Sequence, residues 1–444
     1  MRLRRIAAVW TAKLTARICK MLGKQGVTWA GKIALMIDPK ILTELAGDVK
    51  EKIYVVCGTN GKTTTNNLLC STLEAQKKKV VCNHTGSNML NGCVASFVLA
   101  AGWNGKLDAD YACIEVDEAS ALRIFPHFKP DFMVLTNLFR DQLDRYGEID
   151  ITMNLVRDAM KLAPDMKIIV NADDALSVFV TQESKNPYVT YGIGEKVFDE
   201  SINEIKEGRF CKKCGAKMEY HFYHFSQLGD YYCSSCDFKR PQIKYNASDI
   251  ETGNHLAFTV ENRRIRANYR GFYNIYNILA SYAAAREAGL PLENFQEVLD
   301  AYNPENGRNE HFSIDGTEII LNLAKNPAGF NQNISAVMED KSLKDIIILI
   351  NDNDQDGTDV SWLWDVDFDR FQSDNINSIV VSGIRCQDMR LRLKYVDIPA
   401  EIEPDVEKAI RERIAHGCKN LYVLVNYTGL YSTHNILKRM EEAS

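Results

Sequence analysis

The sequence predicts an α/β protein made of two doubly wound domains. Short apolar runs typical of buried strands alternate with helical segments along most of the chain, a pattern that favours parallel sheets. Polar loops follow most of these runs, and such folds bind ligands in the loops after the carboxyl ends of their strands. The length of 444 residues also exceeds one ordinary domain. We divide the chain into a segment 1–45, a central domain 46–302 and a C-terminal domain 310–444 joined by a linker.

Composition excludes several classes of protein. With 45% hydrophobic and 25% charged residues the chain is ordinary globular protein, and its net charge of −6 argues against nucleic acid as a partner. No apolar run reaches the roughly 18 residues of a membrane-spanning helix. The apolar patch at Ile6–Trp10 is interrupted by Lys13 and Arg17, too early for a secretory signal, so we expect a cytoplasmic protein.

Segment 1–45 begins with a basic amphipathic helix. Residues 1–36 carry eight basic side chains and no acidic one. Apolar residues recur every four positions, at Ile6, Trp10, Leu14, Ile18 and Leu22. Two interpretations remain open. The helix packs on its own domain, or it lies on the anionic inner face of the cell membrane as a peripheral contact.

The central domain opens with a strand, a glycine turn and a helix. The turn reads GTNGKTT and comprises Gly58, Thr59, Asn60, Gly61, Lys62, Thr63 and Thr64. Glycines let backbone N–H groups close on phosphate oxygens, the lysine reaches the β- and γ-phosphates, and the Thr63 hydroxyl binds Mg²⁺. The Walker pattern requires glycine at position 56, where this chain has Val56. Strand, loop and helix together predict a P-loop ATP-binding domain.

Three further strand-like runs follow in this domain, each ending in polar residues. The run ending IEVDEAS places Glu115, Asp117 and Glu118 at a strand end, where carboxylates beside a phosphate loop can hold Mg²⁺. The next runs end in TNL and NADD, and an alanine-rich helix over 271–290 closes the domain.

Four of the twelve cysteines have the spacing of a metal site. Cys211 and Cys214, then Cys233 and Cys236, form two CxxC pairs separated by eighteen residues, which predicts a structural zinc ribbon inserted at 203–245. His221 and His224 lie between the pairs and are expected at the surface. The other eight cysteines are expected to be reduced, as in a cytosolic protein.

The C-terminal domain is predicted from four strand-like runs, TEIILNLA, KDIIILI, NSIVVSG and NLYVLVNY. An acidic loop at 351–369 follows the second run. It carries seven aspartates with no basic residue among them, and it lacks the glutamate that an EF-hand requires. Trp362 and Trp364 within this loop suggest a docking surface.

These motifs, in this order, resemble the Mur ligases, a family of ATP-dependent amide-forming enzymes. Family-like stretches are GTNGKTT, IEVDE, TNLFRDQLDRYG at 136–147, NADD, GFYNIYNILA, the Gly307–Arg308 pair and LAKNPAG at 323–329. The resemblance implies that ATP and Mg²⁺ convert a carboxylate to an acyl phosphate, which an amine then displaces. It implies Glu115 as a magnesium ligand, Asn277 facing adenine, and nucleotide contacts from Asn137, Arg308 and Lys325.

The departures from that family point to one branch of it. Only about 50 residues precede the phosphate-binding strand, too few for the family's uridine-binding domain. Gln142 and Lys325 replace histidines, and no lysine stands near Val156, where many members carry a carbamylated one. Together with the cysteine-rich insertion and the stretch DGTDVSWLWDVDF at 356–368, these departures resemble the MurT-type subunits of lipid II isoglutaminyl synthases. That resemblance implies amidation of D-isoglutamate in the lipid II stem peptide.

The MurT-type resemblance also implies a GatD-type glutaminase partner as the source of ammonia. None of the cysteines lies in the G-x-C-x-G turn of a glutaminase. We interpret Asp352 or Asp356 as orienting a catalytic histidine of that partner. Two alternatives remain: a ligase that adds an amino acid, as folylpolyglutamate synthases do, and a non-catalytic ATP-binding zinc-ribbon protein.

Overall fold

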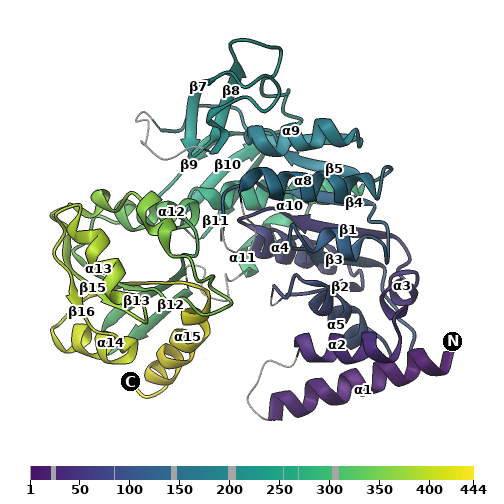
Figure 1. The fold of residues 1–444 in the computed structure, drawn as a ribbon, viewed down its shortest axis with the longest axis horizontal. Helices are drawn as coiled ribbons and strands as arrows, with labels where there is room; N and C mark the ends of the chain where they lie inside the picture. Colours follow the sequence, from purple (N-terminus) through teal and green to yellow (C-terminus); the bar gives the residue numbers. More distant parts are fainter. Residues whose placement is uncertain are drawn as a thin grey trace.

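The computed structural model describes residues 2–21, 27–84, 86–141, 148–198, 207–253, 255–268, 270–302 and 310–444. Figure 1 shows two lobes: the C-terminal domain on the left, and the central domain with the N-terminal helices on the right. None of the helices in these residues is long and apolar enough to cross a membrane.

The central domain is built on a nine-stranded sheet in the order β11-β10-β9-β6-β5-β4-β1-β3-β2. Its strands are β1 Lys52–Cys57, β2 Val80–Cys82, β3 Tyr111–Glu115, β4 Phe132–Leu135, β5 Lys167–Asn171, β6 Tyr188–Ile193, β9 Tyr245–Glu251, β10 Leu256–Val260 and β11 Arg263–Ala267. Seven neighbouring strands of the sheet, from β2 at one edge to β9, pair in parallel, as the sequence predicts. β10 and β11 extend the sheet as an antiparallel edge that the sequence analysis did not predict.

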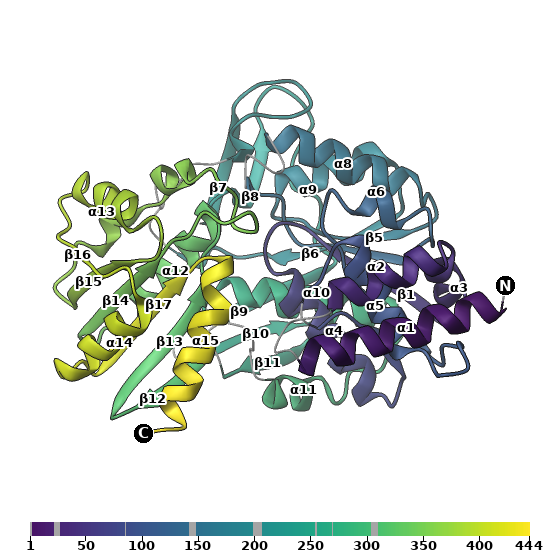
Figure 2. The same cartoon turned by 60° about the horizontal axis from the view of Figure 1, so that its bottom comes forward.

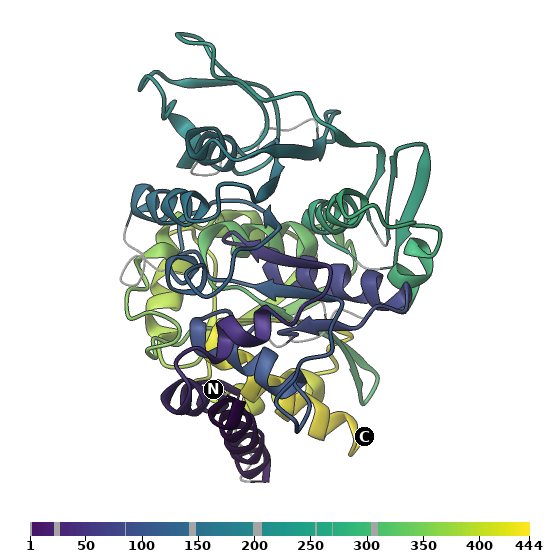
Figure 3. The same ribbon diagram turned by 90° about the vertical axis from the view of Figure 1, so that its right-hand side faces the viewer.

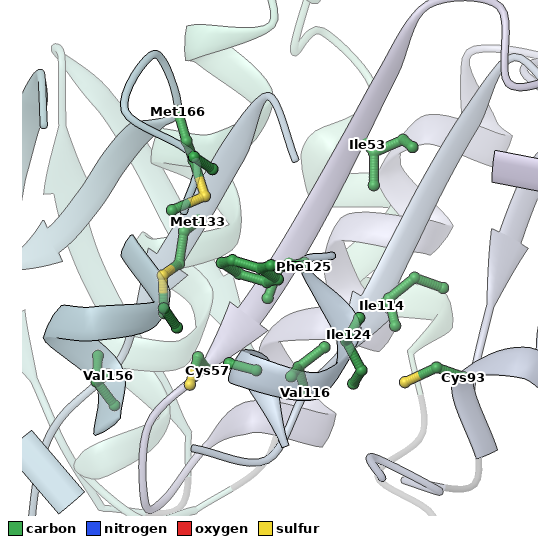
Figure 4. Packing of buried hydrophobic residues seen from close by; sticks show 14 of the residues in the cluster. Ile53, Cys57, Cys93, Ile114, Val116, Ile124, Phe125, Met133, Val156 and Met166 are labelled. Carbon is green, nitrogen blue, oxygen red and sulfur yellow. The ribbon is translucent and has the colours of Figure 1, made fainter. Parts of the chain in front are cut away.

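Helices cover both faces of this sheet. They are α4 Lys62–Ala75, α5 Leu90–Ala100, α6 Ala121–Ile124, α8 Ile149–Lys161, α9 Ala175–Ser184, α10 Tyr273–Glu287 and α11 Phe295–Ala301. Side chains alternate along β1, so that Ile53 and Cys57 enter one core while Tyr54 and Val56 enter the other. Figure 4 shows the first core, in which Ile53 and Cys57 lie with Phe125, Met133 and other buried side chains.

Three helices precede the sheet: α1 Arg2–Met21, α2 Val27–Ile37 and α3 Ile41–Ala46. α1 and α2 lie side by side against α5 (Figure 2). At Gly31 of α2, an added Cβ would lie 1.8 Å from the carbonyl oxygen of Asn91, so only glycine permits this close approach. The packing interpretation of the first helix is confirmed, but the buried residues are Ala8, Val9 and Ala12 rather than the predicted apolar stripe. Leu22 lies outside the described residues.

The predicted insertion forms a two-stranded hairpin of β7 Met218–Phe225 and β8 Leu228–Cys233, preceded by the short helix η1 Glu207–Arg209. It projects from one end of the central domain, at the top of Figure 3. The chain rejoins the main sheet at β9, whose first residue is Tyr245.

The C-terminal domain has a six-stranded sheet in the order β12-β13-β17-β14-β15-β16. Its elements are β12 Glu310–Ile314, β13 Thr317–Leu323, α12 Pro327–Glu339, β14 Lys344–Leu349, η2 Ser361–Asp365, η3 Phe368–Phe371, β15 Ile376–Ser382, α13 Cys386–Lys394, β16 Glu401–Ile402, α14 Val406–Ala415, β17 Asn420–Val425 and α15 Tyr427–Glu441. The four predicted strands are β13, β14, β15 and β17, and all pair in parallel. β12 and β16 are short edge strands that were not predicted.

The two sheets turn their carboxyl edges toward each other. The loop after β13 contacts the loops after β1 and β4, through Asn326 with Asn60 and Lys325 with Asp141. The predicted ligand-binding edges of both domains therefore meet at one place.

Candidate active site

The glycine turn after β1 forms a tight loop leading into α4. Gly61 has a φ of +84°, and a Cβ placed there would lie 2.1 Å from Oδ1 of Asn277. At Gly58 the same addition would lie 2.3 Å from Oγ1 of Thr136. The N-cap residue of α4 is Gly61, which has no side chain to cap the helix. A helix that begins at a glycine turn in this way has the geometry of a phosphate loop.

The loop after β4 fixes the shape of this phosphate loop. The Asn60 N–H donates to Oδ1 of Asn137 at 2.9 Å, and the Asn137 side-chain amide donates back to the Asn60 carbonyl at 3.1 Å. The Thr136 hydroxyl also donates to that carbonyl, at 2.8 Å. Asn137 therefore supports the backbone of the phosphate loop, a role that was not predicted. Its predicted contact with the nucleotide stays a prediction.

Lys62, the first residue of α4, is buried with only 7% of its surface exposed. Its ammonium donates to the Gly58 carbonyl at 2.6 Å and lies 3.3 Å from Oε1 of Glu118. Burial by itself would lower the pKa of Lys62, but Glu118, Glu115 and Asp117 raise it above its usual value. Burial also raises the pKa of Glu118, against the opposing effect of the lysine. The buried Lys62 ammonium is therefore paired with a carboxylate beside the phosphate loop.

The two predicted magnesium ligands lie together. The Thr63 hydroxyl donates to Oε2 of Glu115 at 2.6 Å, and the Asn88 side-chain amide donates to Oε1 at 2.8 Å. The backbone of Glu115 is held at both its N–H and its carbonyl by Asn83, each at 2.8 Å. One hydroxyl and one carboxylate at the mouth of a phosphate loop are the hard oxygen ligands that Mg²⁺ binds, so the donor set fits this ion.

The predicted nucleotide residues of other segments are placed differently. Asn277, in α10, lies against Gly61 at the phosphate loop, and its contact with adenine stays a prediction. Lys325 comes from the C-terminal domain, and its ammonium lies 2.7 Å from Oδ2 of Asp141. Lys325 lowers the pKa of Asp141 although burial of that carboxyl acts in the opposite direction. Arg308 and Gln142 lie outside the described residues. Val156 is fully buried in the core, in α8.

Comparison with known proteins decides the family. Residues 56–285 match the Mur ligase middle domain and residues 323–430 the MurT ligase C-terminal domain. The chain is 35% identical over 431 residues to "Lipid II isoglutaminyl synthase (glutamine-hydrolyzing) subunit MurT" of Staphylococcus aureus (strain COL), covering 96% of each chain. It is a MurT-type member of the Mur ligase family. The protein of the same name from Streptococcus pneumoniae is 33% identical, with 95% of this chain and 94% of the relative covered.

Solved structures share the fold of this Mur ligase. A pseudomurein peptide ligase type C from Methanothermus fervidus superposes with a TM-score of 0.70 at 21% identity, over 89% of this chain and 80% of the other. MurF ligase from Thermotoga maritima, solved in complex with ADP, superposes with a TM-score of 0.61 at 14% identity, over 92% and 84%. These similarities confirm the predicted α/β fold of the Mur ligase type with parallel sheets.

The four cysteines of the two CxxC pairs converge in this ligase. Their sulfur atoms all lie within 4.8 Å of one another, with Cys211 and Cys236 at 3.7 Å and Cys214 and Cys233 at 3.5 Å. A tetrahedral zinc ion with Zn–S bonds of about 2.3 Å separates its sulfurs by about 3.8 Å, so the thiols fit such an ion. All twelve cysteines are free of disulfides. The structure therefore supplies the ligands for a closed, structural metal site.

The β7–β8 hairpin, whose last residue is Cys233 of the cluster, reaches the active-site edge of the sheet. The Gln227 side-chain amide donates to the Leu138 carbonyl at 2.6 Å and to Oδ1 of Asp174 at 3.1 Å. Asp174 accepts from the Leu138 N–H at 2.8 Å and caps α9. The hairpin turn thus holds the loop that follows Asn137. The NADD stretch was recognised in the sequence, but no role was predicted for its aspartates.

His224 was predicted to lie at the surface, and this prediction is wrong. It is buried, with Nδ1 lying 2.7 Å from the Tyr276 hydroxyl and 3.7 Å from Oδ2 of Asp173, while Nε2 donates to the Glu195 carbonyl at 2.9 Å. His221, by contrast, is exposed as predicted. The partners of His224 come from the segments that follow β5 and β6 and from α10, so spacing along the chain did not reveal them.

Arginines from outside the acidic loop of the C-terminal domain pair with two of its aspartates. Arg140 pairs with Asp365, and Arg385 lies 3.4 Å from Oδ2 of Asp352. Trp362 is buried against Phe330, which rules out its predicted role in docking, whereas Trp364 is exposed. The loop is therefore partly neutralised and anchored by its own aromatic residue.

The two predicted aspartates of this loop differ in accessibility. Asp356 is buried and accepts hydrogen bonds from the N–H of Thr428, at 2.8 Å, and from its hydroxyl. Burial raises the pKa of Asp356. Asp352 is only partly buried, directly after the carboxyl end of β14. Asp356 thus holds the start of α15, whereas Asp352 presents its carboxylate at the surface.

Proposed function

We propose that this chain is the ATP-dependent subunit that amidates the α-carboxylate of D-isoglutamate in the stem peptide of lipid II, during peptidoglycan biosynthesis in the cytoplasm. The observation that carries the proposal is the match along nearly the whole chain to two relatives named as MurT subunits of lipid II isoglutaminyl synthase. The phosphate loop, with Lys62 bound to the Gly58 carbonyl and Thr63 in contact with Glu115, supports ATP as the source of energy.

The chemistry follows from what the chain's own groups can hold. A carboxylate oxygen of the substrate attacks the γ-phosphorus of ATP and ADP leaves, which yields an acyl phosphate. Ammonia then attacks the carbonyl carbon, phosphate leaves, and the new nitrogen loses a proton. The N–H groups of the phosphate loop and the charged Lys62 stabilise negative charge on the phosphates. Mg²⁺ held by Thr63 and Glu115 would neutralise the triphosphate when it is bound.

The domain arrangement supports closure over the reacting groups. Lys325 and Asn326 bring the carboxyl edge of the C-terminal sheet onto Asp141 and Asn60 of the central domain. We propose that the Lys62 ammonium exchanges its contact with Glu118 for phosphate oxygens when the nucleotide binds. We further propose that Lys325 contacts the nucleotide or substrate from the opposite side. Water is excluded from the acyl phosphate as the two edges approach.

We propose that ammonia comes from a GatD-type glutaminase subunit, and that Asp352 orients a histidine of that partner. The names of the relatives describe a glutamine-hydrolysing synthase with subunits. Asp352, which lies beside Arg385 but is only partly buried, supports the role better than Asp356, which is buried and binds the N–H and hydroxyl of Thr428. A carboxylate supplied across an interface can hold an imidazole in the required tautomer, as the third member of a triad does.

The experiment that tests both proposals uses the chain purified with its glutaminase. The complex is given ATP, Mg²⁺, lipid II and either glutamine or ammonium, and mass spectrometry follows exchange of one oxygen for one NH group. Wild-type complex should amidate with both donors, and Asp352→Asn should lose only the glutamine-driven reaction. Unchanged glutamine-driven amidation by Asp352→Asn would refute the role of that residue. A product heavier by a whole amino-acid residue would favour a ligase of the folylpolyglutamate type.

A further inference from the structure

The first helix has one buried side and one exposed apolar side. Ala8, Val9 and Ala12 are fully buried beneath it. On its opposite side Leu3, Trp10, Leu14, Ile18 and Met21 are exposed. With 3.6 residues per turn, these five positions fall within an arc of roughly 80°. The helix is therefore anchored by small residues, while its large apolar side chains point away from the protein.

Neighbouring segments continue this surface. Trp29 and Met36 of α2 are exposed, seven positions apart on one side of that helix, and Trp103 is exposed in the loop after α5. The α1–α2 pair lies at the front of Figure 2, along one side of the central domain. We call these eight residues, Leu3, Trp10, Leu14, Ile18, Met21, Trp29, Met36 and Trp103, the N-terminal apolar face. Trp10 is 53% exposed, Leu14 58% and Met21 78%, values unusual for large apolar side chains clustered on a soluble surface.

Three of the five tryptophans of the chain belong to this face. The rings of Trp10 and Trp103 meet edge to face at 5.3 Å, and the Trp10 indole N–H donates to the Trp103 carbonyl at 2.7 Å. The Lys13 ammonium lies 5.3 Å from the centre of the Trp103 ring. Tryptophan, with an apolar ring and one N–H donor, is enriched where protein meets the headgroup region of a bilayer.

The segment that carries most of this face is rich in basic residues. Residues 1–36 hold eight basic side chains and no acidic one, in a chain whose net charge is −6. Among the described residues of this segment, the ion pairs are those of Arg5, with Glu44 and Asp48. Burial lowers the pKa of Lys13, and repulsion from the nearby positive charge of Arg17 lowers it further. Such a cluster needs anions from outside the chain to balance it.

We propose that the N-terminal apolar face docks on an anionic lipid bilayer, with Trp10, Leu14 and Ile18 inserted among the lipids and the lysines and arginines on the headgroup phosphates. An apolar strip flanked by basic residues, with low overall hydrophobicity, is the pattern of a helix that lies in the membrane plane. A second copy of the chain is a poorer occupant, because it would bring two such positive clusters together. The proposal goes beyond amidation, since it concerns residues outside the nucleotide site.

The test measures binding of the full-length chain, with its glutaminase, to vesicles. One set of vesicles is pure phosphatidylcholine and the other contains phosphatidylglycerol. The complex should sediment with the anionic vesicles alone, release as salt rises, and show a blue shift of tryptophan fluorescence on binding. Arg17→Gln combined with Lys20→Gln should weaken binding about 25-fold, at about fivefold per basic residue. Leu14→Gln combined with Ile18→Gln should abolish the blue shift.

A matched control carries the same kinds of change on the other domain. Arg390→Gln with Leu391→Gln replaces an exposed basic and an exposed apolar residue of α13, and should bind vesicles as the wild type does. Because all these side chains are on the surface, ATP turnover and thermal unfolding verify that each variant is folded. Equal binding to neutral vesicles, or equal binding by all variants, would overturn the proposal. Loss of a dimer, or of glutaminase binding, in the Leu14→Gln/Ile18→Gln variant without any lipid binding by the wild type would overturn it in favour of a protein partner.

Discussion

The ammonium of Lys325 lies 2.7 Å from the Asp141 carboxylate, and this pair joins the carboxyl edges of the two sheets. The side-chain amide of Asn326, the next residue, reaches Oδ1 of Asn60 in the phosphate loop at 3.2 Å. A residue of the C-terminal domain thus donates a hydrogen bond to a side chain of the loop that would hold phosphate. We expect the relative position of the domains and nucleotide turnover to depend on each other through this contact.

The first prediction concerns that ion pair. Lys325→Met and Asp141→Asn should each lower kcat/KM for ATP in the amidation reaction. The double variant should lose less than the sum of the two, with a coupling energy of about 1 kcal/mol, because both charges are largely buried and in contact. Steady-state kinetics of the four proteins measure the coupling. Strictly additive losses would show that the pair is not linked in the reacting state.

The second prediction separates the catalytic and structural roles of Lys62. Lys62→Met should reduce amidation at least about 100-fold, because it removes a charge aimed at the phosphates. It should also destabilise the protein by about 3 kcal/mol, because Glu118 would remain buried without its cation. Lys62→Met combined with Glu118→Gln should recover most of the stability and none of the activity. Denaturant unfolding and product formation measure the two quantities, and full activity of Lys62→Met would contradict the proposed role in catalysis.

The features that could be predicted are those formed by residues close together in the sequence. The strand, glycine turn and helix around Lys62 follow from apolar runs and from glycine at positions where a Cβ would collide with a neighbour. Glu115 was found because carboxylates at a strand end beside a phosphate loop meet the hydroxyl that starts the helix. The two CxxC pairs were found because each is a tight turn that presents two thiols.

Residues with distant partners could not be assigned in the same way. His224 looks like a surface histidine in the sequence, and it is buried because Asp173, Tyr276 and the Glu195 carbonyl surround it. Trp362 resembles an exposed anchor, yet it packs against Phe330 of α12. Trp10, Leu14 and Ile18 of the predicted apolar stripe are exposed, whereas Ile6 is half-buried, and only the packing of Ala8, Val9 and Ala12 reveals which side of the helix faces outward.

The third prediction concerns the cysteine cluster. The purified chain should contain one zinc ion, and Cys233→Ser should lose it. Since Gln227 of the same hairpin holds the Leu138 carbonyl beside the active site, loss of the metal should lower both the melting temperature and the rate of amidation. Metal analysis and thermal unfolding provide the readouts, and Cys19→Ser, outside the cluster, is the matched control. Retention of stoichiometric zinc by Cys233→Ser would exclude this site.

The fourth prediction is a loss of stability in mild acid that depends on His224. Burial lowers the pKa of His224, and the nearby Asp173 opposes this shift without cancelling it. The unfolded chain therefore takes up a proton near pH 6.5, where the folded chain does not, so the free energy of unfolding falls as pH drops below that value. The slope is at most about 1.4 kcal/mol per pH unit for one group. The raised pKa of Asp173 acts in the opposite direction, since a folded state that binds a proton more readily gains stability in acid.

Comparison of variants separates the effect of His224 on stability from the opposing effect of Asp173. His224→Gln keeps Asp173, cannot take up a proton, and should show a shallower fall in stability between pH 6.5 and pH 5 than the wild type when urea unfolding is followed across that range. His221→Gln changes an exposed histidine three residues away and should keep the wild-type slope. Identical slopes for the wild type and His224→Gln would mean that the imidazole gains its proton equally in both states. The hydrogen bonds to Tyr276 and Glu195 would then compensate fully for its burial.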